Sequence, residues 1–231
     1  MALRPFLTAA LVLLALPLLR AQEPPPLRVV SDAAEYRAEA AADPARKMVD
    51  LAKAVPGLVL DIRYATSDNF MKRPLYDSPR AFLRAPAAAA LRGAEDDLRA
   101  RGLGLKVYDA YRPYAVTARM WKEHANVSAN YIAPPTLGSD HNRGIAIDVS
   151  LVELATGREV PMPTEFDDFS MRAWRDYANL PLNVLYDRGL LRDTMEAHGF
   201  HGLESEWWHF AYHNAKAYSV LDLPFSTFDA K

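Results

Sequence analysis

The sequence predicts a single domain of the mixed α+β class, with a small central, mainly antiparallel sheet flanked by helices. Half of the 231 residues are apolar, which is enough to bury a substantial core. Segments with strand patterns and segments with helix patterns are interspersed along the chain, which is typical of one sheet covered by helices. Neither an internal repeat nor a second boundary rich in Pro and Gly divides the chain.

Four segments have the pattern of helices. Three of them begin or end at a residue that favours a helix terminus: the capping pair Asp32 and Glu35, Pro86 in a first turn, or Gly102 and Gly199 after a last turn. The predicted helices cover residues 32–42, 87–101, 114–123 and 183–197.

Four other segments have the composition of strands, covering residues 58–64, 105–108, 145–151 and 207–212. In the third, aliphatic residues alternate with Ala146, Asp148 and Ser150, so Asp148 is expected on a defined face of the sheet. Residues 58–64 are expected to form a core strand. The long segment from His124 to Gly138, with two adjacent prolines, is expected to be a functional loop.

Composition excludes several kinds of partner and site. The 27 Lys and Arg residues nearly balance the 29 Asp and Glu residues, and no long basic run is present, so nucleic acid is not an expected partner. The chain has no cysteine, which excludes disulfides, a thiol nucleophile and thiolate metal ligands. Any metal site must therefore be built from histidines and carboxylates.

The first 21 residues have the pattern of a signal peptide. Arg4 precedes an apolar run from Phe6 to Leu19, which is shorter than the roughly 20 residues of a membrane-spanning helix, and Ala21 is small enough for cleavage. We predict export to the periplasm and no stable membrane association after cleavage; an uncleaved anchor is the alternative. Residues 22–31, which begin QEPPP, are predicted to be a linker, and residues 32–231 the functional domain.

Two constellations carry the chemistry. His141 lies seven residues before Asp148, with Gly144 between them to permit a sharp turn; on spacing alone this could also be a surface hydrogen-bonded pair. Near the C-terminus, ESEWWHFAY places Glu206 three residues before His209.

A hydrolytic zinc site needs three ligands from His and carboxylate side chains and a further carboxylate that accepts a proton from water. His141, Asp148, His209 and Glu206 supply this set. Because residues three apart face opposite sides of an ideal strand, Glu206 is expected in the turn before the strand or on a bulge. Trp207 and Trp208 are expected to pack in the core rather than to contact substrate.

Arg112, in the segment YDAYRP, is a permanent cation whose forked donors suit a carboxylate or a developing oxyanion. Asp109 is interpreted either as the partner that orients Arg112 or as an acid in a turn. The other histidines are expected at the surface or at helix caps, and His201 is the most plausible false ligand among them.

Together these residues resemble the D-alanyl-D-alanine dipeptidase family of VanX-type zinc peptidases, related in fold to D,D-carboxypeptidases and the Hedgehog signalling domain. The resemblance runs from about Leu58 to the C-terminus. The family patterns S-x-H-x-x-G-x-A-x-D and E-x-x-H are met from Ser139 to Asp148 and from Glu206 to His209. The stretch DIRYATSDNF also matches, and YDAYRP departs from the family's D-G-Y-R-P only at Ala110.

The resemblance implies one zinc ion per chain on His141, Asp148 and His209, with Glu206 as general base and acid and Arg112 stabilising the oxyanion. It implies that the substrate is a small dipeptide, D-alanyl-D-alanine, hydrolysed to two D-alanines in peptidoglycan metabolism. The predicted substrate-binding residues are Tyr64, Asp167, Ser139 and Asp109, the last of which is also the possible partner of Arg112.

By the same comparison, Tyr64 and Asp167 would hold the substrate's ammonium and Ser139 would contact its carboxylate; Asp168 is the alternative to Asp167. An export signal is unexpected for an enzyme that clears a cytoplasmic dipeptide pool, so two alternatives stay open. One is an exported D,D- or L,D-carboxypeptidase that trims stem peptides, and the other is a non-catalytic, zinc-stabilised binding module. The ligand set also suits iron(II), and the sequence defines neither the second residue of the substrate and its stereochemistry nor the oligomeric state.

Overall fold

The computed structural model describes residues 27–124, 131–213 and 217–229. The predicted signal peptide and the first part of the predicted linker lie outside these residues. Within them, no helix combines the length and the apolar character needed to cross a membrane.

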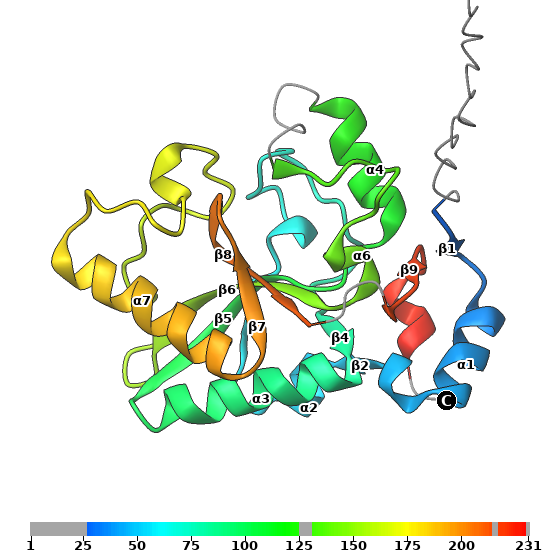
Figure 1. The fold of residues 1–231 in the computed structure, drawn as a ribbon, viewed down its shortest axis with the longest axis horizontal. Helices are drawn as coiled ribbons and strands as arrows, with labels where there is room; N and C mark the ends of the chain where they lie inside the picture. Colours follow the sequence, from blue (N-terminus) through cyan, green and yellow to red (C-terminus); the bar gives the residue numbers. More distant parts are fainter. Residues whose placement is uncertain (1–26, 125–130, 214–216, 230–231) are drawn as a thin grey trace, which may run out of the picture.

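The centre of the fold is a five-stranded sheet with the strand order β3-β5-β6-β8-β7 (Figure 1). Only the pairing of β3 with β5 is parallel, so the predicted mixed, mainly antiparallel architecture is confirmed. The strands are β3 (Val59–Leu60), β5 (Leu103–Asp109), β6 (Ala146–Glu153), β7 (Phe200–Leu203) and β8 (Glu206–Tyr212).

Two small sheets extend the fold beyond the sequence prediction. β1 (Val29–Val30) pairs in parallel with β9 (Val220–Leu221), and β2 (Met48–Asp50) pairs antiparallel with β4 (Phe82–Arg84). Val30 is completely buried, so the end of the segment predicted as a linker is part of the folded unit. Two-residue strands have no readable periodicity, and only their distant partners define them.

Two long helices, α3 (Ala85–Arg99) and α7 (Leu182–Ala197), pack against each other and against strands of the central sheet (Figure 1). Gly102 and Gly199 follow them with positive φ, as their predicted role as stop residues requires. The other α-helices within the described residues are α1 (Ala33–Ala42), α2 (Leu51–Ala54), α4 (Tyr114–Glu123) and α6 (Asp140–Arg143). The 3-10 turns cover residues 44–46, 63–65, 171–173 and 225–228.

The predicted core strand at residues 58–64 is wrong in length and position. Only β3 forms there, at the edge of the sheet, and the side chain of Val59 is exposed. The amide of Asn69 donates to the carbonyls of Arg63, Thr66 and Arg73, and this holds the following chain in a loop. Such side-chain bonds to the backbone compete with strand pairing and place Tyr64 in a 3-10 turn.

Candidate active site

The strands bring three of the predicted residues into one row. In the sheet register, Asp148 of β6 lies opposite His209 of β8 on one side and opposite Asp109 of β5 on the other. Residues directly opposite each other in antiparallel strands project from the same face. The side chains of Asp109, Asp148 and His209 therefore lie close together, although Asp109 and His209 are 100 residues apart along the chain.

His141 joins this row from α6, immediately before β6. Gly144 ends α6 with a φ of +71° and turns the chain into the strand. The positive φ favours glycine, and a Cβ atom at this position would lie 2.6 Å from the end of the Met48 side chain, which would have to shift.

The atoms that face one another have the spacing of a metal site. His141 Nε2 lies 3.1 Å from His209 Nδ1, and Asp148 Oδ1 lies 3.0 Å from His209 Nδ1 and 3.4 Å from His141 Nε2. Ligands bound to zinc at about 2.0–2.1 Å in a tetrahedron are about 3.3 Å apart. Among the described residues, His141, Asp148 and His209 are the one group of this kind, and its donors fit a divalent cation.

Neighbouring groups orient the ligand atom of His141 and keep the Asp148 carboxylate ionised. The Nδ1–H of His141 donates to the carbonyl of Ala110 at 2.7 Å, which turns Nε2 toward the other two ligands. Burial by itself would raise the pKa of Asp148, but the adjacent His141 and His209 lower it below its usual range. The carboxylate therefore stays ionised, which is the form that binds a metal ion.

Glu206 lies beside the cluster without belonging to it. It is the first residue of β8, and a register shift in the β7–β8 pairing places it opposite Leu203, as the predicted turn or bulge requires. Its Oε2 is 3.8 Å from His209 Nδ1, and its side chain is buried. Burial, together with the charges of Asp148 and Asp167, raises the pKa of Glu206 well above its usual range.

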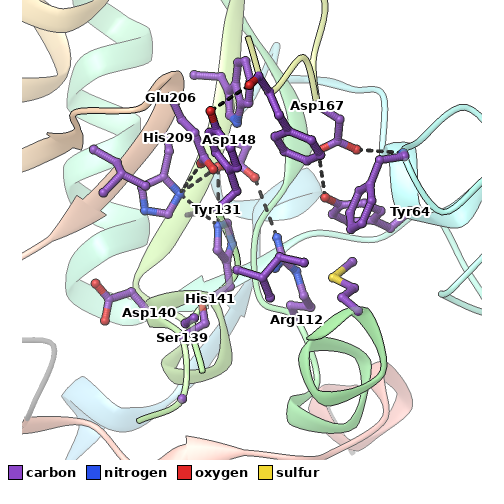
Figure 2. A pocket seen from close by; sticks show the side chains of 18 residues that line it. Tyr64, Arg112, Tyr131, Ser139, Asp140, His141, Asp148, Asp167, Glu206 and His209 are labelled. Atoms are coloured by element: carbon purple, nitrogen blue, oxygen red, sulfur yellow. Dashed lines mark hydrogen bonds and ion pairs between the residues drawn. The ribbon is translucent and has the colours of Figure 1, made fainter. Parts of the chain in front are cut away.

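Arg112 lies on the other side of the metal ligands (Figure 2). Its Nε and Nη2 both donate to Asp109 Oδ2, at 2.9 and 2.7 Å, and the hydroxyl of Tyr76 donates to Asp109 Oδ1 at 2.7 Å. Arg112 Nη2 also lies 3.9 Å from Asp148 Oδ2. Both oxygens of the fully buried Asp109 have protein partners, so the interpretation that Asp109 orients Arg112 agrees with the structure, whereas the substrate contact also predicted for it does not.

Tyr64 and Asp167 form a second polar group at the pocket wall. The hydroxyl of Tyr64 donates to Asp167 Oδ1 at 3.0 Å, and the backbone N–H of Phe70 donates to Oδ2 at 3.2 Å. Burial raises the pKa of Asp167 to about 7 despite these bonds. Asp168 instead accepts from the backbone N–H of Ser170, which identifies Asp167 as the acid that faces the pocket.

The three metal-ligand residues and Glu206, Arg112, Tyr64 and Asp167 all line one pocket of about 320 Å³, within the size range of small-molecule sites, whereas Asp109 does not. Ser139, the N-cap of α6, accepts from the His141 backbone N–H at 3.2 Å and also faces this pocket. Lining residues that sequence reasoning did not single out include Phe70, Met120, Tyr131, Asp140 and Leu203. Tyr131 lies in the segment expected to be a functional loop, whereas nothing in the sequence distinguishes a lone acid such as Asp140.

The residues expected to be structural lie away from the metal ligands or within the core. His201 is exposed on β7, and His198 pairs with Asp97 at 2.8 Å. Trp207 and Trp208 are buried, although Trp208 also borders the pocket.

Sequence comparison with known proteins places this chain in a peptidase family. Residues 44–230 match the family model described as D-Ala-D-Ala dipeptidase, Peptidase_M15. The D-alanyl-D-alanine dipeptidase of Escherichia coli K12 is 35% identical over 79% of this chain and 93% of its own length, and that of Enterococcus faecium is 33% identical over 69% and 88%. The solved LD-carboxypeptidase LdcB is 20% identical, with a TM-score of 0.43 over 74% of this chain and 70% of its own. The chain therefore belongs to the D-Ala-D-Ala dipeptidase family of metallopeptidases.

Proposed function

We propose that the protein is a zinc-dependent dipeptidase that hydrolyses D-alanyl-D-alanine to two D-alanines. The observation that carries this proposal is the approach of the three donor atoms of His141, Asp148 and His209 to within 3.0–3.4 Å, with the unliganded Glu206 beside them. The relatives at 33–35% identity, which are D-alanyl-D-alanine dipeptidases, support the substrate.

A zinc ion held by these three side chains would supply a Lewis acid that polarises the scissile carbonyl, activates a water molecule and favours the ionised form of Glu206. The carboxylate of Glu206 accepts a proton from the attacking water and then delivers it to the nitrogen of the leaving D-alanine. Its burial beside the cluster keeps bulk water from competing for that proton.

Arg112 stabilises the negative charge that develops on the carbonyl oxygen. Its guanidinium is fixed by Asp109 and lies over the ring of Tyr64, 5.0 Å from the ring centroid, so it needs no reorganisation during the reaction. A preorganised donor of this kind typically contributes about 10²–10³-fold to the rate.

Asp167 and Ser139 determine the length of the substrate. The carboxylate of Asp167, supported by Tyr64, pairs with the free ammonium, and the hydroxyl of Ser139 donates to the far carboxylate. A stem peptide has no ammonium at the corresponding position, so it would leave Asp167 without a cation. This disfavours a carboxypeptidase, and the presence of an acid at Glu206 disfavours a silent binding module.

The pattern of residues 1–21 supports export, so the substrate would come from turnover of cell-wall peptidoglycan outside the cytoplasm. The mature protein is expected in the periplasm, without its first 21 residues.

The direct test incubates the purified, zinc-loaded protein with D-Ala-D-Ala and separates the products by chiral chromatography. Release of D-alanine is expected, and Glu206→Gln should keep its zinc, measured by elemental analysis, while kcat falls by about 10²-fold or more. Release of D-alanine from a pentapeptide stem but not from the dipeptide would replace the proposal with a carboxypeptidase. No release from either substrate would contradict a peptidase.

A further inference from the structure

Asp140 is an acid of the pocket that the proposed mechanism does not use. It is half-buried, it lines the pocket, and its carboxylate has no hydrogen-bond or ion-pair partner among the residues that the structure describes. The other pocket acids differ in this respect: Asp148 and Glu206 lie near the metal-ligand histidines, and Asp167 accepts two hydrogen bonds. A carboxylate without a partner in a binding pocket is available for a ligand.

The position of Asp140 assigns it to one end of the substrate. It follows Ser139 in the chain, and in Figure 2 the metal ligands lie between it and the pair formed by Asp167 and Tyr64. A dipeptide with its ammonium at Asp167 and its scissile carbonyl at the metal ligands would therefore place its second residue near Asp140.

The charges around this second residue favour a cation. Four carboxylates and one guanidinium line the pocket, and the guanidinium of Arg112 is already paired with Asp109. Asp148 is a ligand of the metal, Asp167 is assigned to the substrate's ammonium and Glu206 to proton transfer, so among the described pocket residues Asp140 is the carboxylate left without a positive partner. A D-Ala-D-Ala zwitterion brings no net positive charge and places its own carboxylate beside Asp140, where the two repel.

We propose that Asp140 is a specificity-determining residue that favours dipeptides whose second residue has an ammonium on its side chain. This inference rests on the proposed function and names its substrate class. Tyr131 and Leu203, which also line the pocket, offer apolar surface for the methylene stem of such a side chain, while its ammonium pairs with Asp140.

The test compares kcat/KM for three dipeptides: D-Ala-D-Lys, its uncharged analogue D-Ala-D-norleucine, and D-Ala-D-Ala. The wild-type enzyme is expected to prefer D-Ala-D-Lys over D-Ala-D-norleucine by about 10-fold, the effect of one partly buried charge pair. Asp140→Asn should remove this preference and raise kcat/KM for D-Ala-D-Ala about twofold. Asp96→Asn, which removes an exposed carboxylate from α3 outside the pocket, should keep the wild-type preference.

A second readout measures binding without turnover. Isothermal calorimetry of zinc-loaded Glu206→Gln should give tighter binding of D-Ala-D-Lys than of D-Ala-D-norleucine, and the difference should disappear when Asp140→Asn is added. Equal selectivity with and without Asp140 would overturn the inference and leave the dipeptidase intact, provided that D-Ala-D-Ala is still cleaved. Failure to cleave any of the three dipeptides would overturn the inference together with the proposed function.

Discussion

At the scale of single residues, Asp109 and Asp167 show how surroundings separate two carboxylates of the same site. Asp109 is paired with a guanidinium and a tyrosine hydroxyl, so its charge is balanced within the protein. Among the residues that the structure describes, Asp167 accepts bonds only from the uncharged Tyr64 hydroxyl and the Phe70 N–H, and its raised pKa, about 7, reflects burial without a cation bonded to it there. It is thus suited to pair with a cation that the substrate brings.

Replacing Asp167 with Asn should therefore stabilise the fold at pH 8 and weaken substrate binding. The pKa is raised in the folded state, so the stability contributed by Asp167 is complete below about pH 4 and is lost as the pH rises through about 7. Asn has no charge to bury and tolerates the φ of +62° at this position.

The free energy of unfolding of Asp167→Asn should exceed that of the wild type by about 2 kcal/mol at pH 8, because solvent access reduces the roughly 4 kcal/mol of the full shift. Urea denaturation at pH 5 and pH 8 measures this difference, which should be much smaller at pH 5. KM for the dipeptide should rise at least about 10-fold. Asp168→Asn is the matched control, and a wild-type KM in Asp167→Asn would refute the ammonium-binding role.

At the scale of secondary structure, the site depends on how α6 enters β6. The left-handed Gly144 lies between the ligands His141 and Asp148, close to Met48, so any change in this turn moves one ligand relative to the other. The sheet register then aligns Asp148 with His209.

Gly144→Ala tests this coupling, with Gly157→Ala as a matched control. Gly157 has a similar φ of +69°, but a Cβ atom added there would meet no other atom within 4 Å, so Ala should cost only about 1 kcal/mol and leave zinc affinity unchanged. Gly144→Ala should cost more, because Met48 must also move, and should weaken zinc binding about 10-fold or more. Denaturation and competition with a chelator measure the two effects; equal zinc affinities in the two variants would contradict the coupling.

The elements with strong local signals could be predicted from the sequence, and those defined by distant partners could not. Asp32 accepts a hydrogen bond from the Ala34 N–H as a helix cap, and α4 has the predicted bounds, because capping and apolar spacing act within a few residues. The same locality explains why the two-residue strands and the true length of β3 were not predictable.

In the candidate site, too, residues in local motifs could be predicted and contacts between distant residues could not. His141, Asp148, Glu206 and His209 stand in motifs with definite spacing, and the structure brings them together. The pairing of Asp109 with Arg112, three residues away, could be expected, but its second partner, Tyr76, lies 33 residues away and no spacing pattern shows it.

At the scale of the whole molecule, Arg84 joins segments that are far apart in the chain. This fully buried side chain donates to the carbonyls of Arg46, Arg143 and Ser219, which connects β4 with the chain after α1, with the end of α6 and with the segment before β9. Burial lowers the pKa of Arg84 to about 10, although the nearby Tyr36 and Glu39 partly oppose this shift.

Arg84→Lys should lower the free energy of unfolding by about 2 kcal/mol or more. A single ammonium cannot reproduce the fork that reaches all three carbonyls, and each buried group left unpaired costs about 1–3 kcal/mol. Arg92→Lys, on the exposed face of α3, makes the same chemical change and should be nearly neutral. Equal urea midpoints for the two variants would show that Arg84 does not hold these segments together.

The most direct measurement of the central claim is an anomalous difference map at the zinc absorption edge from crystals of the zinc-loaded protein. It should show one peak per chain, about 2.0–2.2 Å from His141 Nε2, Asp148 Oδ1 and His209 Nδ1, with Glu206 outside bonding distance. A zinc peak elsewhere, or none among these three side chains, would contradict the proposed metallopeptidase site.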